Sequence, residues 1–240
     1  MIIDVHVHFG DWFFPIESAG VGSILKFMKK YGIEKSILSS SLGVVYNFME
    51  GNKSLAEAIK GYDNLLGYVT VNPNYQEESL EEMKKYLAQK NFVGVKMHPS
   101  YVGQPFTSKE SVALMKMVED FNVPLLLHTY GESAYQAAEA AKKCPNLKII
   151  MGHMGGNVWQ AAIRAAKEAD NLFLEPCCSY PESDKIKEAV DTVGAERIVF
   201  GSDSTLIEPV YVLGMIEDAD ISQKEKEMIL YENAKKLFNI

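Results

Sequence analysis

The sequence predicts one α/β domain over residues 1–240, a regular or distorted (β/α)8 TIM barrel with an extra C-terminal helix. The first observation is that apolar, β-branched runs of strand length alternate with amphipathic helical stretches along the whole chain. The second is that these runs are almost continuously apolar, as expected for parallel strands that helices cover on both faces. Eight such units in 240 residues favour a closed barrel.

The strands are predicted, in chain order, at Ile2–His8, Lys35–Ser40, Leu66–Val71, Phe92–His98, Pro124–His128, Lys148–His153, Asn171–Cys177 and Arg197–Asp203. Helices are predicted between them where apolar residues recur at helical spacing. These are centred near Ile24–Tyr31, Leu55–Tyr62, Glu77–Gln89, Ser108–Phe121, Ala134–Lys143, Val158–Ala169 and Lys185–Val193, and Ser222–Leu237 closes the chain. Ser108 and Ser222 are helix start signals, because a serine hydroxyl can accept a hydrogen bond from a first-turn N–H.

Composition and charge exclude several classes of partner. With 47% hydrophobic and 23% charged residues, the chain is an ordinary globular protein with a large core. A net charge of −8 and scattered lysines argue against binding nucleic acid or an anionic membrane. No segment approaches the roughly 18 apolar residues that span a bilayer, and no basic stretch precedes an apolar run at the N-terminus. We expect a cytoplasmic protein, and a homodimer is one possible oligomeric state.

The cysteines are not arranged as a disulfide framework. They are Cys144, Cys177 and Cys178, an odd number with two adjacent in the chain. We expect all three to be reduced and to pack as small hydrophobic residues. The alternative is that Cys177 or Cys178 lines a site.

All five histidines fall in the C-terminal halves of predicted strands: His6, His8, His98, His128 and His153. Any one of them alone would more simply be a hydrogen-bonded core residue. Five in the same position on four strands indicate a common cause, because those strand ends converge at one mouth of a barrel. The sequence therefore predicts a shared site there.

A metal-binding set can be composed from these strand ends. His6 and His8 lie at i and i+2, so both side chains point to the same face of the first strand. His128 ends the fifth strand and Asp203 ends the eighth. Three imidazoles and a carboxylate suit one Zn²⁺ or another borderline divalent ion, with positions left for water and substrate. The alternative for Asp203 is a plain helix N-cap.

The remaining polar strand ends are assigned to catalysis and substrate binding. His153 precedes glycines that allow a sharp turn, and we favour it as a general acid/base over a ligand of a second metal. Lys96 and His98 share a face of the fourth strand and are predicted to bind substrate. A buried lysine needs a partner, so we expect an unmodified Lys96 that pairs with a substrate carboxylate. Its alternatives are a carbamate or a lysine that reaches solvent at the rim.

Six motifs together resemble the second amidohydrolase family, the group related to aminocarboxymuconate-semialdehyde decarboxylase. They extend over essentially the whole chain, at Asp4–His8, Gly94–Pro99, Leu127–His128, Gly152–Gly156, Gly201–Asp203 and Glu232–Phe238. The resemblance implies a single metal ion on His6, His8, His128 and Asp203, with His153 next to the metal-bound water. It leaves the reaction open, because members of the family hydrolyse lactones or amides, hydrate, or remove carboxylate without a redox cofactor.

Our first functional hypothesis is hydrolysis of a small amide, ester or lactone, in which the ion activates water and Asp203 accepts the proton. The alternatives are non-oxidative decarboxylation or hydration of an unsaturated or aromatic carboxylic acid, and a non-catalytic barrel that only binds metal or ligand. In each enzymatic case we expect a small substrate that carries a carboxylate. The predicted apolar walls of its pocket are Trp12, Phe13, Phe14, Tyr46, Tyr101, Tyr130 and Tyr180.

Overall fold

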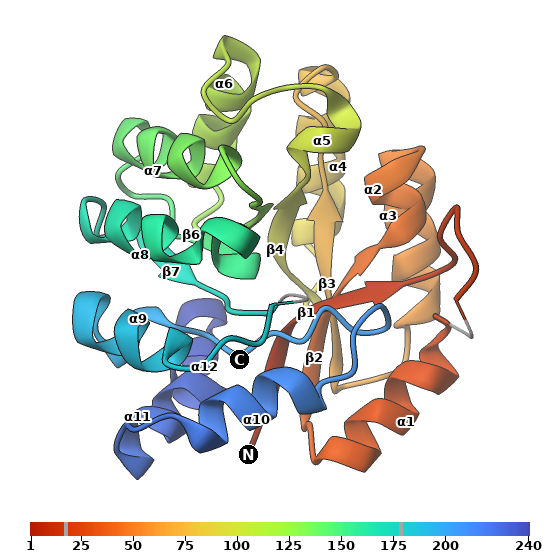
Figure 1. Cartoon of the computed structure of the whole chain (residues 1–240). Coiled ribbons are helices and arrows are strands. Elements are labelled where there is room, and N and C mark those ends of the chain that lie inside the picture. The colour runs from red at the N-terminus through yellow and green to blue at the C-terminus, as the bar shows by residue number, and fades with distance from the viewer. Residues whose placement is uncertain (17–18, 178–179) are drawn as a thin grey trace.

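The computed structural model describes residues 1–16, 19–177 and 180–240. Its central feature is one parallel sheet of seven strands, in which spatial neighbours follow chain order. The strands are β1 (Ile3–Phe9), β2 (Lys35–Ser40), β3 (Leu65–Thr70), β4 (Phe92–Met97), β5 (Leu125–His128), β6 (Ile149–Gly152) and β7 (Leu172–Leu174). Figure 1 shows the strands at the centre and the helices around them. The predicted α/β class is confirmed, and each of the first seven predicted strands overlaps an observed one.

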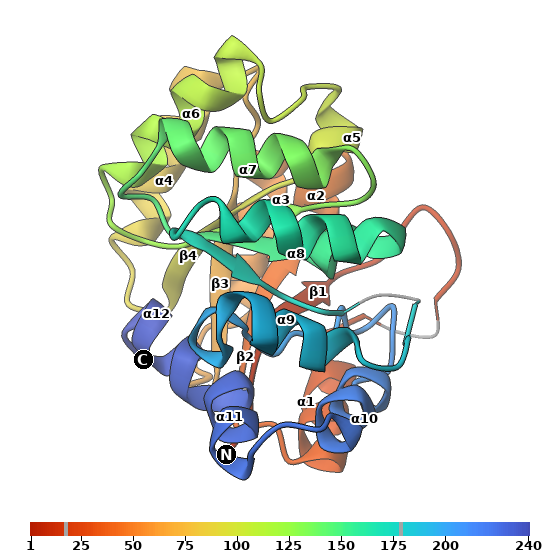
Figure 2. The same ribbon diagram turned by 60° about the vertical axis from the view of Figure 1, so that its left-hand side comes forward.

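Helices pack on the outer face of this sheet, and Figure 2 shows α7, α8 and α9 side by side in front of the strands. The longer helices that follow the strands are α1 (Val21–Tyr31), α3 (Phe48–Ala58), α4 (Gln76–Leu87), α6 (Lys109–Glu119), α7 (Ser133–Lys143), α8 (Trp159–Lys167) and α9 (Lys185–Val193). Short helical segments are α2 (Ser41–Val45), α5 (Pro99–Val102), η1 (His153–Val158) and η2 (Ala195–Arg197). None of the described helices is long and apolar enough to cross a membrane.

Two helix predictions need correction. Helix α3 begins at Phe48 rather than near Leu55, because the Asn47 side chain accepts hydrogen bonds from two first-turn N–H groups and caps the helix. Helix α10 (Val210–Asp218) was not predicted at all.

The C-terminal helix matches its prediction closely. It is formed by α11 (Gln223–Glu227), a π-helical turn, η3 (Met228–Glu232), and α12 (Asn233–Phe238). Ser222 and Glu225 form a reciprocal capping box at its start.

The eighth predicted strand, Arg197–Asp203, does not form among the described residues. The segment nevertheless joins the two edges of the sheet by single bridges, Ile198 to β7 and Ser204 to β1. It cannot form a continuous ladder, because the Ser202 N–H donates to the Asp4 carboxylate at 3.0 Å rather than to a neighbouring strand. Seven of the eight predicted strands are therefore confirmed among the described residues; the eighth segment lies where the strand was expected but forms no ladder.

The interior of the curled sheet is filled by an apolar plug. Its buried side chains come from β1, β2, β3, β5 and β6, from the segment that contains Val199 and from α12. They are Ile3, Val5, Ile37, Leu66, Tyr68, Leu126, Ile150, Val199, Ala234 and Phe238. The pairing of β1 with β2 shifts register between Asp4 and Val7. Because of this irregularity, Val5 belongs to the plug. His6 and His8, which follow it, lie beyond the plug at the carboxyl ends of the strands.

Candidate metal centre

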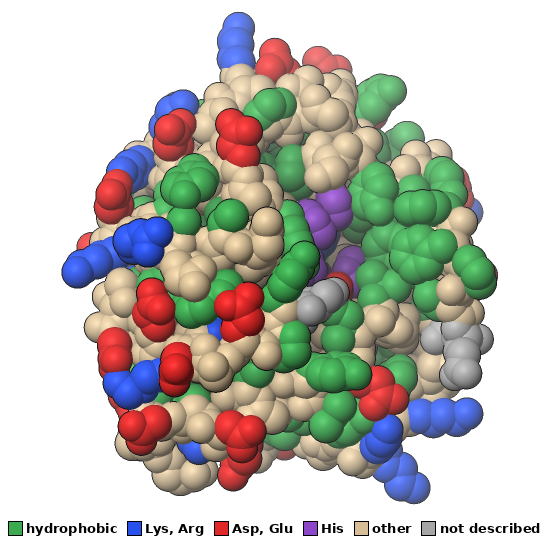
Figure 3. Space-filling model, viewed as in Figure 1, with side chains coloured by type: hydrophobic (Ala, Val, Ile, Leu, Met, Phe, Trp, Pro, Cys, Tyr) green, Lys and Arg blue, Asp and Glu red, His purple; other side chains and the backbone are tan. Residues whose placement is uncertain are grey.

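The seven predicted site residues lie in one cluster at the carboxyl ends of the strands. They are His6, His8, Lys96, His98, His128, His153 and Asp203, and all but the half-buried His128 are buried. Figure 3 shows histidine side chains in a hollow near the centre of this face, bordered by hydrophobic side chains. Charged side chains lie mostly towards the edge of the same view. Residues far apart in the sequence thus share one recessed site.

Three potential ligand atoms face one another in this cluster. Asp203 Oδ1 lies 3.1 Å from Nε2 of His8 and 3.6 Å from Nε2 of His6. These three side chains form a group whose ligand atoms are all within 4.8 Å of one another. Asp203 Oδ1 is buried and has no hydrogen-bond partner among the described residues. A buried carboxylate oxygen without a donor is costly, and a divalent cation between it and two imidazoles would satisfy it.

Hydrogen bonds on the far side of the rings orient His6 and His8 towards this point. His6 Nδ1 lies 2.8 Å from the Glu175 carboxylate, which can only accept, so Nδ1 carries the proton and Nε2 has the lone pair. His8 Nδ1 lies 3.2 Å from Ser39 Oγ, whose hydroxyl is within 3.5 Å of the Val7 carbonyl. If Ser39 donates to that carbonyl, it accepts from His8 Nδ1. Both Nε2 atoms then carry the lone pair that an ion would bind, and the lone pair of His6 has Lys96 Nζ at 3.1 Å.

His128 and His153 form a second pair beside the first group. His153 Nδ1 lies 3.1 Å from the Cys177 carbonyl and must donate to it, so Nε2 is the unprotonated nitrogen of the neutral ring. That Nε2 lies 2.9 Å from His128 Nδ1, which therefore donates and leaves Nε2 of His128 as an acceptor. His128 is adjacent to the three-atom group but is not part of it. The structure thus brings three of the four predicted ligands together and places the fourth beside them.

Burial keeps the imidazoles neutral. It is the largest cause that lowers the pKa of each histidine below 6.5, and the charge of Lys96 lowers most of these values further. The pKa of His98 falls to about 2 for the same two reasons. Its ring stacks on that of His128, with 3.8 Å between centroids. Neutral imidazoles are the form that binds a metal ion.

Lys96 lies inside the site rather than at its rim. Its side chain is 0% exposed, which excludes the alternative of a lysine that reaches solvent. Nζ is 3.1 Å from His6 Nε2. Burial lowers the pKa of Lys96 to about 8, although the charge of Asp203 opposes the shift. Burial also raises the pKa of the Asp203 carboxyl, but its electrostatic interaction with His153 and its interaction with the nearby His8 outweigh this and bring it below the ordinary value.

The backbone is unusual at two of these residues. His153 has φ 66° and Asp203 has φ 60°, in the left-handed region that side chains other than glycine rarely adopt. The turn after His153 continues through Gly155 and Gly156 at positive φ, and a Cβ on Gly156 would lie 2.3 Å from the Tyr130 ring. Such conformations persist where the surrounding structure enforces them, and they concentrate at functional sites.

Reasoning from sequence missed Glu175, which orients His6. It lies in the C-terminal half of the predicted strand Asn171–Cys177, as Lys96 and Asp203 do in their predicted strands, so the same rule could have found it. Cys177 lies in the site, which agrees with the alternative prediction that Cys177 or Cys178 lines it. Cys178 lies outside the described residues. Cys144 is buried elsewhere in the core.

Several predicted wall residues surround the mouth. Trp12 lies 5.0 Å from the His8 ring, Tyr101 4.4 Å from His98 and Tyr130 5.7 Å from His128, measured between centroids. The others pack on these or line a neighbouring cavity: Phe13, Phe14, Tyr46 and Tyr180. That cavity measures about 290 Å³, and His98 and Tyr101 are part of its wall.

Comparison with known proteins places this site in context. A model of the family described as amidohydrolase matches residues 3–240. No curated protein sequence gives a significant match.

Several solved structures share the fold. 5-Carboxyvanillate decarboxylase from Sphingomonas paucimobilis superposes with a TM-score of 0.82 at 13% identity, covering 100% of this chain and 99% of that one. A dihydroxybenzoic acid decarboxylase from Polaromonas sp. JS666, with bound manganese and the inhibitor 2-nitroresorcinol, gives 0.78 at 20% identity, covering 99% and 96%. A probable 2-pyrone-4,6-dicarboxylic acid hydrolase from Acinetobacter baumannii, with citric acid bound, gives 0.74 at 17% identity, covering 100% and 99%.

Proposed function

The chain belongs to the amidohydrolase family, and from this premise we propose that it is a divalent-metal-dependent decarboxylase of a small unsaturated or aromatic carboxylic acid. The observation that carries the proposal is the buried Asp203 Oδ1, which lacks a hydrogen-bond donor among the described residues and faces the Nε2 atoms of His6 and His8. His128, with its Nε2 left as an acceptor, is the fourth proposed ligand. When bound, the ion would polarise an oxygen of the substrate.

The chain's own residues would supply binding and proton transfer. Lys96 is the cation placed to pair with a substrate carboxylate, and the neutral His98 borders the same space. Decarboxylation breaks one C–C bond, and the electron pair that remains on carbon takes a proton, so no redox cofactor is required. His153 is the residue proposed to deliver that proton: its Nδ1–H is fixed by the Cys177 carbonyl, so Nε2 would first take up a proton from water and then give it to the carbon.

Two of the described neighbours favour decarboxylation over hydrolysis. They act on aromatic acids that carry ring hydroxyl or methoxy groups, as their names state, and one holds manganese. Decarboxylation was the alternative in the sequence interpretation, in which hydrolysis came first. The hydrolase reading remains the second candidate, because a probable pyrone dicarboxylic acid hydrolase shares the fold.

Product analysis on metal-loaded protein separates the two candidates. 2,6-Dihydroxybenzoate and 5-carboxyvanillate should release CO₂ in a ratio of one to each ring product, and chelation should stop the reaction. Hydrolysis of a pyrone or other lactone without CO₂ release, and no turnover of either acid, would refute the decarboxylase and support the hydrolase.

We propose one divalent ion per chain, which elemental analysis of protein loaded with either ion would test. The sequence favours zinc, but imidazole and carboxylate ligands suit manganese as well, so the identity of the ion is an open part of the proposal. Turnover by both the zinc and the manganese forms can be compared directly. A ratio of two ions per chain would contradict the single-ion site.

A further inference from the structure

Glu175 is a fully buried carboxylate that takes no part in the reaction proposed above. Oε2 accepts hydrogen bonds from His6 Nδ1 at 2.8 Å, from the Cys177 thiol at 2.9 Å and from the backbone N–H of His153 at 3.2 Å. Oε1 accepts from the backbone N–H of Cys177 at 2.7 Å. Four donors converge on one side chain, which links the ends of β1, β6 and β7.

The surrounding backbone leaves room for this carboxylate. Gly201 lies in the segment that joins the two edges of the sheet, and a Cβ there would lie 2.7 Å from Cδ and Oε1 of Glu175. Any other residue at this position would push the carboxylate away from His6. The glycine is therefore part of the same arrangement as Glu175.

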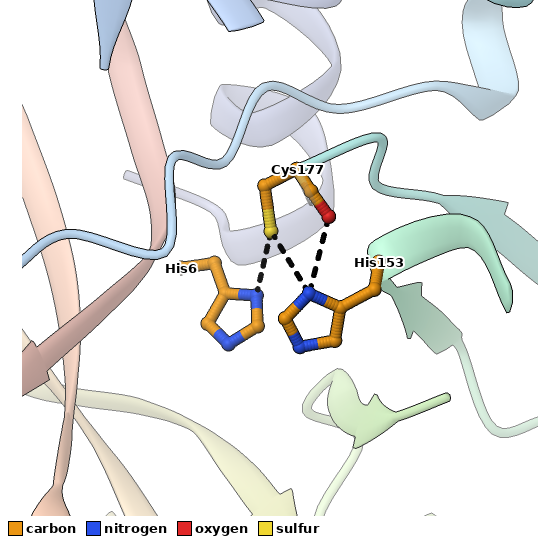
Figure 4. A group of neighbouring side chains, drawn as sticks. All are labelled: His6, His153 and Cys177. Atoms are coloured by element: carbon orange, nitrogen blue, oxygen red, sulfur yellow. Dashed lines mark hydrogen bonds between the residues drawn. The ribbon is translucent and has the colours of Figure 1, made fainter. Parts of the chain in front are cut away.

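The same region could be considered a second cation site. His6 Nδ1, His153 Nδ1 and Cys177 Sγ lie within 4.8 Å of one another, and Figure 4 shows both imidazoles directed at the sulfur. Each of these atoms, however, already has a hydrogen-bond partner: Glu175 for His6 and for the thiol, and the Cys177 carbonyl for His153. This contrasts with Asp203 Oδ1, which has no such partner among the described residues. Hydrogen bonding explains the cluster without an ion.

We propose that Glu175 is the positioning residue of the metal centre. By accepting the His6 Nδ1 proton, it fixes the tautomer whose Nε2 lone pair faces Asp203. By accepting the backbone N–H of His153, it holds the left-handed turn that presents that ring. The inference rests on the proposed cation site but not on the reaction, so its test needs no substrate.

The experiment measures the His6 tautomer and the affinity for metal. Protein labelled with ¹⁵N-histidine contains five imidazoles, which single substitutions can assign. In metal-free wild-type protein, His6 should carry its proton on Nδ1. Glu175→Gln keeps the volume but replaces one acceptor oxygen by an NH₂ donor, so the Nδ1–H form should lose population. The Kd for Zn²⁺ or Mn²⁺, measured against a competing chelator, should rise by roughly 10- to 100-fold.

Two control variants isolate the effect. Glu82→Gln changes another buried glutamate, which accepts from the Asn52 amide at 3.0 Å and lies on α4. It should leave both the tautomer and the Kd as in wild type. Cys177→Ser keeps a donor to Glu175 and should also keep the tautomer.

Several outcomes would overturn the proposal. One is a wild-type His6 protonated on Nε2 in the metal-free protein, a measurement that needs no variant to fold. Another is a Glu175→Gln protein with unchanged tautomer and Kd. A second equivalent of Co²⁺ with a thiolate charge-transfer band, absent in Cys177→Ser, would make the cluster a cation site instead. If wild-type protein binds no divalent ion but its His6 tautomer depends on Glu175, the proposed cation site fails while the role of Glu175 in fixing the ring is supported.

Discussion

The two halves of the site are built from similar residues but differ in how their polar atoms are satisfied. Where β1 meets the segment before Ser204, the Asp203 oxygen faces the Nε2 atoms of His6 and His8 and has no hydrogen-bond partner among the described residues. Where β5 meets β6, each ring nitrogen of His153 has a defined partner, His128 on one side and the Cys177 carbonyl on the other.

This difference indicates a division of labour. A set of facing acceptors is completed by a cation, whereas His153 has a hydrogen-bond partner at both ring nitrogens and can pass a proton. In this half only Nε2 of His128 is left for the ion. The presence of histidine alone does not reveal which role a strand end has. The role is revealed by the direction of the hydrogen bond on the far side of each ring, because that bond decides which nitrogen carries the proton.

The largest effect is expected in the half with facing acceptors. Asp203→Ala should leave metal content near zero and lower kcat/KM by at least about a thousandfold, because the only carboxylate of the proposed ligand set is lost. Elemental analysis and steady-state kinetics measure both quantities. Near-stoichiometric metal in this variant would break the assignment of the ion to this half.

A large effect on turnover alone is expected at His153, in the other half. His153→Asn should retain its metal and lose roughly 10²- to 10⁴-fold in kcat, as for removal of a general acid/base. His128→Ala is the paired variant and should lose both metal and activity. Equal metal loss in the two variants would make His153 a ligand and would erase the division.

Lys96→Met tests the cation that lies between the halves. It should raise KM by about 10- to 100-fold while leaving metal content intact, the pattern of a lost contact with a substrate carboxylate. Metal content and KM are measured on the same preparation. Two equivalents of metal in wild-type protein, reduced in this variant and restored by bicarbonate, would instead show that Lys96 is carbamylated.

A smaller effect concerns stability of the metal-free protein. The histidine pKa values lie below 6.5 in the fold, so below that pH the unfolded chain binds more protons than the folded one. The contribution of these histidines to the free energy of unfolding should therefore be constant above pH 6.5. Below that pH it should fall, by up to about 1.4 kcal/mol per pH unit for each histidine. Urea unfolding at several pH values measures it. Saturation with metal should leave the slope at least as steep, because a bound ion keeps the folded imidazoles unprotonated while those of the unfolded chain still take up protons. A free energy of unfolding that does not fall as the pH decreases below 6.5 would contradict the prediction.

Much of this site could be predicted because strand ends are visible in the sequence. Apolar runs that end in His or Asp indicate which side chains reach the mouth, and this placed His6, His128 and Asp203 at one end of the barrel. The boundaries of the eighth unit were not predictable in the same way. Its ladder is interrupted because the Asp4 carboxylate accepts the Ser202 N–H, a contact between residues at opposite ends of the chain.

The roles within the site were harder to predict than its members. The sequence does not show that His6 donates to Glu175 or that His153 donates to a backbone carbonyl, and these bonds decide which nitrogen is free. Glu175 lies in the C-terminal half of a predicted strand, but the sequence does not show that its carboxylate packs beside Gly201 and reaches His6.

The seam formed by the segment between Ile198 and Ser204 has a consequence for local opening. It joins the sheet by single bridges and a few backbone bonds, such as Val5 N–H to Phe200 O at 3.0 Å and Asp203 N–H to His6 O at 2.8 Å. Asp203 belongs to this segment, whereas His6 and His8 belong to β1, the strand that it joins. An ion bound to His6, His8 and Asp203 would hold this segment against β1. Amide hydrogen exchange at Val5 and Asp203 should therefore slow when the ion binds. The ion would then connect the two edges of the sheet at a place where no continuous ladder joins them.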